Sequence, residues 1–282
     1  MSLRLIISPA KRMRPVEGPP FAQTEPQFLS DAVSLARQLR SLSYVELREL
    51  WGCSERLAAE NARRVRTLAE DMAADTGTLT AAVMAYDGIQ YQHLRASVMD
   101  ERQLSWLGEH LRIASGLYGL LRPFDGVVPY RLEMQAGLAV DGARNLYQYW
   151  GGRPYDALCS GRDVDTIVNL ASIEYARAML PQHARDAPPH ALGTGPRVVT
   201  CLFGDIRTSD DRLVQRATEA KATRGTFVRW CAERGVDSVV EMRDFDERGY
   251  ALDERRSDDT TLAFTRAHSI HALSGSLCAR RS

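Results

Sequence analysis

Short apolar runs and longer amphipathic stretches alternate irregularly along the chain. The runs are rich in Val, Ile and Leu and end at Pro, Gly or Ser, which is typical of buried strands. The segment 3–7 is an example, because its apolar run ends at Ser8 and Pro9. We predict strands or extended segments over 3–7, the first part of 111–123, 127–134, 165–170, 198–203, 238–242 and 261–264.

The amphipathic stretches place apolar residues three and four positions apart, which predicts helices with one buried face. In 27–40, for example, Leu35, Ala36 and Leu39 share a face. Ser43 and Glu46 have the spacing of a capping box, which would begin the next helix. The predicted helices cover 27–40, 54–72, 79–95, 100–111, 145–159, 172–180 and 212–234.

This order of elements favours a mixed α/β (α+β) fold, in one compact domain of unusual topology over 1–266. Strands and helices do not follow one another in regular βαβ units. The segment 181–197 is rich in Pro and Gly, and we interpret it as a surface excursion rather than a domain boundary. The tail 267–282 has no clear periodicity, and we expect it to be partly disordered.

The composition limits which cellular compartment and which binding partners we expect for this protein. No apolar run is long enough for a transmembrane helix, and the N-terminus is too short and polar for a secretion signal, so we expect no membrane partner. The five Cys are irregularly spaced, which indicates buried thiols in a reducing cytoplasm rather than a disulfide framework. Lys+Arg and Asp+Glu both number 36, so any affinity for nucleic acid must come from a local patch.

Only two of the basic residues are Lys, at Lys11 and Lys221. An ammonium group can change its protonation state in ways that Arg cannot, so both lysines are candidates for chemistry. Each lies in a short polar island within apolar surroundings. Ligands of open sheets bind beyond the strand ends, where the islands near Ser8 and Ser172 would lie. The candidate cleft residues are Ser8, Lys11, Arg131, Glu133, Ser172, Glu174, Tyr175, Lys221 and Arg224, and the catalytic candidates among them are Lys11, Glu174 and Lys221.

Residues 47–58 follow the helix-hairpin-helix pattern, within an inserted element at about 43–70. In that pattern Gly52 permits the turn, Ser54 begins the second helix, and Ala58 allows the helices to pack closely. The backbone N–H groups at the start of the second helix would bind a DNA phosphate without reading bases. An ordinary pair of antiparallel helices would show the same pattern. The candidate DNA-binding residues are Gly52, Cys53, Ser54, Arg56, Asn61, Arg63 and Arg64.

Other familiar site patterns are missing from the sequence. There is no H-E-x-x-H pair, P-loop, G-x-G-x-x-G fingerprint or G-x-S-x-G elbow. We therefore expect neither a metal site nor a bound cofactor.

The polar islands, in this order, resemble the YaaA family of peroxide-stress proteins. The motifs that carry the resemblance are Ile-Ser-Pro-Ala-Lys at 7–11, Tyr-Asp-Gly at 86–88 with Tyr91, Ser-Gly-Leu-Tyr-Gly-Leu-Leu-Arg-Pro at 115–123 with Asp125, Pro-Tyr-Arg-Leu-Glu-Met at 129–134, Asn-Leu-Ala-Ser at 169–172 with 174–175, Lys221 with 224–225, 249–250, and Phe264 with Arg266. The resemblance implies a cytosolic protein of one unusual α/β fold that contributes to resistance to hydrogen peroxide, with lower free iron and less DNA damage. It also implies DNA binding through a helix-hairpin-helix beside a positively charged cleft, which falls on residues 50–58 here.

Two function classes remain open. The leading hypothesis is a mostly monomeric protein that binds DNA non-specifically, favouring distorted or branched structures and protecting against oxidative damage. The alternative is an enzyme that uses Lys, Glu, Ser and Tyr side chains on a small anionic or nucleotide-like substrate. A third hypothesis is direct sequestration of iron, but the sequence offers no cluster of metal-ligating residues for it. A long open basic groove would favour DNA, whereas a closed pocket around Lys11 and Lys221 would favour the enzyme.

Overall fold

The structure is a computed structural model that describes residues 2–160, 164–180, 195–207 and 209–266. A mixed sheet runs through the protein, with five parallel strands at its centre. The central strands, in spatial order, are β3 (Leu111–Ser115), β1 (Ser2–Ile7), β6 (Val164–Asn169), β7 (Arg197–Arg207) and β10 (Thr261–Arg266). The antiparallel strands are β4 (Gly119–Leu121) beside β3, β9 (Tyr250–Leu252) beside β10, and β8 (Arg212–Val214) on the end of β7. A separate pair joins β2 (Thr80–Ala81) to β5 (Gly126–Val127).

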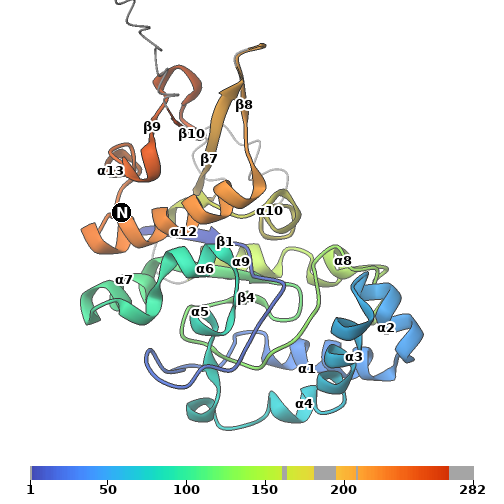
Figure 1. Ribbon diagram of the computed structural model, residues 1–282. Helices are drawn as coiled ribbons and strands as arrows, with labels where there is room; N and C mark the ends of the chain where they lie inside the picture. The colour runs from blue at the N-terminus through green and yellow to red at the C-terminus, as the bar shows by residue number, and fades with distance from the viewer. Residues whose placement is uncertain (1, 161–163, 181–194, 208, 267–282) are drawn as a thin grey trace, which may run out of the picture.

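Helices cover the sheet and form a cluster at one end of the molecule. The cluster, drawn in blue and cyan in Figure 1, is far from the projecting β7–β8 hairpin. It contains α1 (Leu29–Ser41), α2 (Tyr44–Trp51), α3 (Glu55–Val65) and α4 (Leu68–Asp71). The other α-helices are α5 (Ala82–Ala85), α6 (Ile89–Leu94), α7 (Glu101–His110), α8 (Leu146–Trp150), α9 (Arg153–Cys159), α10 (Ile173–Met179), α12 (Ala217–Arg234) and α13 (Val239–Met242). Short 3₁₀ turns cover Thr76–Thr78, Ala96–Val98, Glu247–Gly249 and Glu254–Arg256.

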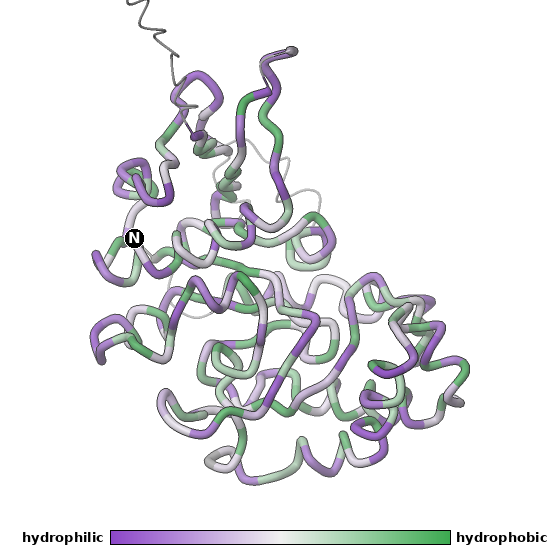
Figure 2. Tube along the Cα trace, in the orientation of Figure 1, coloured by the Kyte–Doolittle hydropathy of each residue, from purple (hydrophilic) through white to green (hydrophobic). Residues whose placement is uncertain are grey.

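The core follows the predicted apolar runs. Leu5, Ile6 and Ile7 of β1 are fully buried. Figure 2 shows hydrophobic positions concentrated along the central strands, with hydrophilic positions alternating along the outer helices. An aromatic cluster beside α12 includes Phe203 and Phe227, whose ring centroids are 5.5 Å apart. The predicted mixed α/β architecture is therefore confirmed.

Helices α6 and α12 approach each other unusually closely. A Cβ atom added at Gly225 of α12 would lie 1.9 Å from the carbonyl oxygen of Gln90 in α6. No side chain fits in that space, so the glycine lets the two backbones meet. This contact brings the N-terminal half of α12 over the end of β1.

Several predicted elements differ from the observed ones. The predicted strand over 238–242 is wrong, because the capping box of Ser238 and Glu241 begins α13 there. The predicted helix over 212–234 begins only at Ala217, because 212–214 pair with β7 as β8. The predicted helix over 79–95 is divided into β2, α5 and α6. The predicted helix over 145–159 is broken at Gly151 and Gly152 into α8 and α9. Most of the 181–197 excursion and all of the 267–282 tail lie outside the described residues.

The predicted capping box at Ser43 is confirmed, since Ser43 and Glu46 bond reciprocally at the start of α2. Gly52 ends that helix in the left-handed region, with φ 50°. Residue Ser54 then precedes α3. The chain between 43 and 65 thus forms two helices joined by a tight turn, which here is called the helix pair.

Candidate functional site

A cavity of about 480 Å³ opens at the carboxyl ends of β1 and β6, and it is called the cleft here. All of the predicted cleft residues line it. They are Ser8, Lys11, Arg131, Glu133, Ser172, Glu174, Tyr175, Lys221 and Arg224. Segments more than 200 residues apart in the chain therefore meet around one recess, as expected for ligands that bind beyond strand ends.

Two serines join the ends of neighbouring strands at the floor of the cleft. The Ser8 Oγ accepts a hydrogen bond from the Ser172 backbone N–H at 2.8 Å and donates to the Ser172 Oγ at 3.2 Å. The Tyr91 hydroxyl donates to the Ser8 carbonyl oxygen at 2.9 Å. No basic side chain is bonded to the Ser8 hydroxyl among the described residues, so its contacts suit a positioning role rather than that of an activated nucleophile.

An ionic triad forms one wall. The Nζ of Lys11 lies 2.7 Å from Glu133, and Arg131 donates to the other oxygen of that carboxylate at 3.0 Å. The Trp51 indole N–H of α2 donates to the Arg131 carbonyl oxygen at 2.6 Å, which ties the helix pair to this wall. The Nε of Arg131 is buried and has no hydrogen-bond partner within the described structure. The triad thus offers the cleft a fixed carboxylate and one unsatisfied donor.

Glu174 is the second carboxylate of the cleft and has a different environment. It is half-buried near the start of α10 and accepts a hydrogen bond from the Gln135 backbone N–H at 3.2 Å. Burial, reinforced by the charge of Glu133, raises the pKa of Glu174. Burial also raises the pKa of the neighbouring Tyr175 well above its usual range, so its phenol stays protonated. The Tyr175 phenol can therefore act as a hydrogen-bond donor near neutral pH, and the raised pKa of Glu174 means that its carboxyl holds a proton more readily than an ordinary Glu side chain.

Lys221 and Arg224 supply positive charge from α12. They are one helical turn apart and face the cleft together. Neither makes an ion pair or a side-chain hydrogen bond with any residue that the structure describes. Burial lowers the pKa of Arg224, whose Nε is buried and unpartnered. A charged group in this condition is costly unless an anion compensates it.

The cleft also contains residues that the polar islands did not indicate as site residues. Arg12 and Asp87 form an ion pair of 3.3 Å at the rim. Tyr130 lies deeper, where its hydroxyl is within 2.9 Å of the Tyr86 hydroxyl and 2.7 Å of the Ser115 hydroxyl. The Tyr-Asp-Gly motif at 86–88 was a usable signal, because it directly follows the apolar run 81–85.

Comparison with known proteins identifies the family of this chain. The family model described as "Peroxide stress protein YaaA" matches residues 3–256. The chain belongs to this family. A UPF0246 protein of Pediococcus pentosaceus is 42% identical over 250 residues, covering 88% of this chain and 92% of that protein. UPF0246 proteins of Lactiplantibacillus plantarum and Lachnoclostridium phytofermentans are 40% and 37% identical, covering 94% and 95% of this chain and 100% and 98% of theirs.

Family membership confirms the resemblance drawn from the sequence motifs, and most of those motifs line the cleft. The segments 8–11, 87–91, 130–133 and 172–175 all contribute to its walls. The motif 115–123 supports a wall of the cleft without lining it. A Cβ atom at Gly116 would lie 2.3 Å from the Leu132 carbonyl oxygen, so this glycine lets the segment carrying Arg131 and Glu133 pack against the end of β3.

The predicted DNA-binding residues lie on the helix pair, beside the cleft rather than in it. Asn61 is buried, and its amide donates to the Leu57 carbonyl oxygen at 2.7 Å. Arg64 bonds Glu60 at 2.6 Å. The remaining predicted residues are placed at the turn or toward solvent on α3. Gly52, Ser54, Arg56 and Arg63 are exposed, and Cys53 is half-buried.

Acidic residues surround the helix pair. Glu55 in the first turn of α3 lies 3.2 Å from Arg48 and accepts a hydrogen bond from the Tyr44 hydroxyl. A second recess of about 780 Å³ between α2 and residues 135–139 is lined by Glu46 and Glu49 and shares the ionic triad with the cleft. These carboxylates reduce the positive field on this side of the molecule.

The described residues contain no group of three or more His, Cys, Asp or Glu placed to hold a metal ion. Within the same residues, no helix is both long and apolar enough to cross a membrane.

Proposed function

We propose that this member of the peroxide-stress family is a cytosolic protein whose cleft binds a small anionic, nucleotide-like ligand and acts on it as an enzyme. The observation that carries the proposal is the pair of cations on α12. Lys221 and Arg224 face a cavity of about 480 Å³ without acidic partners among the described residues. A partly open cavity of this size, lined by both lysines, suits a small molecule better than a duplex.

The side chains around the cleft divide into binding and proton-transfer groups. Lys221 and Arg224 would hold the anionic part of the ligand by charge-assisted hydrogen bonds. Glu174, whose pKa is raised by burial, would serve as the general acid. Glu133, held by Lys11 and Arg131, would accept a proton or orient a polar group of the ligand. In this arrangement Lys11 acts through its charge on Glu133.

Calorimetry with AMP as the probe tests the binding step. The variants Lys221→Met and Arg224→Met should each weaken AMP binding about 10- to 100-fold, since each removes a charged hydrogen-bond donor worth about 1.5–3 kcal/mol. Arg234→Met is the matched control, because Arg234 lies on the same helix and packs over Trp230 outside the cleft. Equal affinities for wild type and both cleft variants would contradict the proposal.

DNA binding by the helix pair is a second candidate function. One observation favours it: Ser54 makes no side-chain capping bond at the start of α3, which leaves that exposed end open to a phosphate. Arg56 and Arg63 on the same helix are exposed and can add contacts to the phosphate backbone of DNA.

The variant Gly52→Asp tests this second candidate, because it places a like charge beside the bound phosphate. We expect duplex and junction affinities to fall about fivefold at low salt, equivalent to about 1 kcal/mol. Gly52→Asn is the matched control, since it introduces the same left-handed strain without the charge. If fluorescence anisotropy gives the same affinity for the Asp and Asn variants, the turn does not contact DNA.

A further inference from the structure

A second cationic cavity lies on another part of the sheet. It has a volume of about 310 Å³ and shares no lining residue with the cleft. Three arginines from separate segments line it, namely Arg4 of β1, Arg112 of β3 and Arg122 just after β4. Arg112 is paired with Ile6, so Arg112 and Arg4 project from the same face of the sheet. This cavity is called the arginine recess here.

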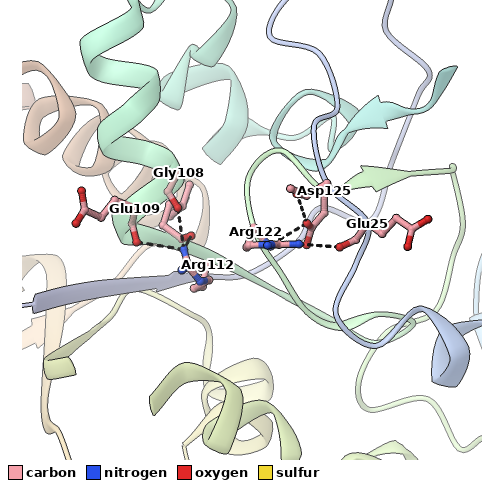
Figure 3. A network of polar contacts seen from close by, with 8 residues as sticks. Glu25, Gly108, Glu109, Arg112, Arg122 and Asp125 are labelled. Atoms are coloured by element: carbon pink, nitrogen blue, oxygen red, sulfur yellow. Dashed lines mark hydrogen bonds and ion pairs between the residues drawn. The ribbon is translucent and has the colours of Figure 1, made fainter. Parts of the chain in front are cut away.

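Two of these arginines are fixed by the carboxyl ends of helices. Arg4 donates to the Ala157 carbonyl oxygen at 3.1 Å and to the Ser160 carbonyl oxygen at 2.8 Å, at the end of α9. Arg112 donates through Nη1 to the Gly108 and Glu109 carbonyl oxygens at the end of α7, as Figure 3 shows. Helix ends carry only partial negative charge, so these bonds position the guanidinium groups without neutralising them.

The arginine recess has an excess of positive charge. Asp125 is the one carboxylate on its described lining, and it is almost fully buried. Arg122 already binds it, with its Nε 3.0 Å from the carboxylate and its backbone N–H donating at 2.8 Å (Figure 3). Burial and the positive charges of Arg4 and Arg122 lower the pKa of Arg112 to about 10. The Nε and Nη2 of Arg112 make no hydrogen bond with the described residues and remain available to a ligand.

We propose that the arginine recess binds a phosphate group, either as inorganic phosphate or as a phosphate monoester. Guanidinium groups bind phosphate and carboxylate oxygens in a forked geometry. Arg112 presents Nε and Nη2 for such a fork, whereas Arg4 and Arg122, which are bonded to carbonyl oxygens and to Asp125, add positive charge from two other segments. This concentration of positive charge suits a phosphoryl group, which can carry two negative charges, better than a carboxylate, which carries one. The amide of Gln27 on the same lining adds a neutral donor.

Thermal unfolding of the full chain tests the proposal, in a Lys221→Met/Arg224→Met background that removes the two cleft cations without an acidic partner among the described residues. About 20 mM phosphate should raise the Tm above that in chloride of equal ionic strength, because a ligand bound only by the folded state stabilises it. Acetate should give no such rise. AMP in place of phosphate shows whether the site also accepts a monoester. Adding Arg122→Gln should weaken phosphate binding about tenfold.

Chemical protection supplies a readout that needs no change in the recess. Phosphate should slow phenylglyoxal modification of Arg122 at least about fivefold, measured by peptide mass spectrometry, while Arg144 on the exposed surface reacts unchanged. The proposal is overturned if phosphate stabilises no better than chloride, if Arg122→Gln keeps the full effect, or if Arg122 is not protected. These results leave AMP binding in the cleft unaffected, so the two proposals can fail separately.

Discussion

At the scale of single residues, the cleft contains two carboxylates in opposite electrostatic settings. Glu133 lies 2.7 Å from Lys11 and 3.0 Å from Arg131. Glu174 accepts one backbone hydrogen bond and faces the charge of Glu133. A carboxyl whose pKa is raised by burial, beside a second carboxylate held by cations, is a common arrangement in acid and base pairs. This contrast is the physical basis for assigning proton donation to Glu174.

The raised pKa of Glu174 predicts a pH-dependent stability. Between its ordinary pKa of 4.5 and its raised folded value, the folded state binds more protons than the unfolded state. Stability contributed by this group is therefore present at low pH and is lost as the pH rises through the folded pKa. In urea unfolding, the free energy of unfolding of the wild type should fall between about pH 4 and pH 7, and Glu174→Gln should lack the part of this fall that comes from Glu174. The difference should stay below about 1 kcal/mol, because half of the side chain faces solvent.

Glu101→Gln, an exposed substitution at the start of α7, serves as the control for this comparison. Its stability profile should run parallel to that of the wild type. The assignment of Glu174 is contradicted if the profile of Glu174→Gln is parallel to the wild type as well.

At the scale of elements, the sequence predicts best where local chemistry and burial agree. The strand at 3–7 and the capped start of α2 were predicted because apolar runs and caps are encoded by adjacent residues. The cleft residues were predictable because polar groups that follow buried strands converge at one edge of a parallel sheet. Elsewhere the secondary-structure prediction was wrong where a segment's structure depends on pairing with a strand that is distant in the sequence. The segment 212–214 becomes β8 only because the end of β7 extends beside it, and no local signal records that partner.

The arginine recess could not be predicted from the sequence for a related reason. Arg4, Arg112 and Arg122 are separated by long stretches of chain and occur among many other arginines. Only the register between β1 and β3, together with the turn after β4, brings them to one cavity. The strand prediction over 238–242 was wrong for a different reason. Val239 and Val240 favour a strand locally, but the Ser238 cap begins the α13 helix there.

At the scale of the whole molecule, a net charge of zero conceals two separate cationic cavities. Positive residues gather in the cleft and in the arginine recess, while many other arginines pair with carboxylates on the surface. The net charge of zero gives no uniform field that would draw DNA over the surface, and these cations lie in cavities whose shape would also select a ligand. This distribution is the physical reason for our proposal that the cleft binds a small ligand rather than a duplex.

The thiols of the described chain give a molecule-wide prediction about peroxide. Cys201 in β7 and Cys231 in α12 are fully enclosed, and burial raises the pKa of both thiols. The thiolate is the form that reacts with peroxide, so these cysteines should be inert in the folded protein. Treatment with hydrogen peroxide followed by peptide mass spectrometry should find them unoxidised until the chain is unfolded, with half-buried Cys53 reacting earlier. Sulfenic acid on Cys201 of the native protein at low peroxide would show instead that this buried thiol reacts with peroxide in the folded state.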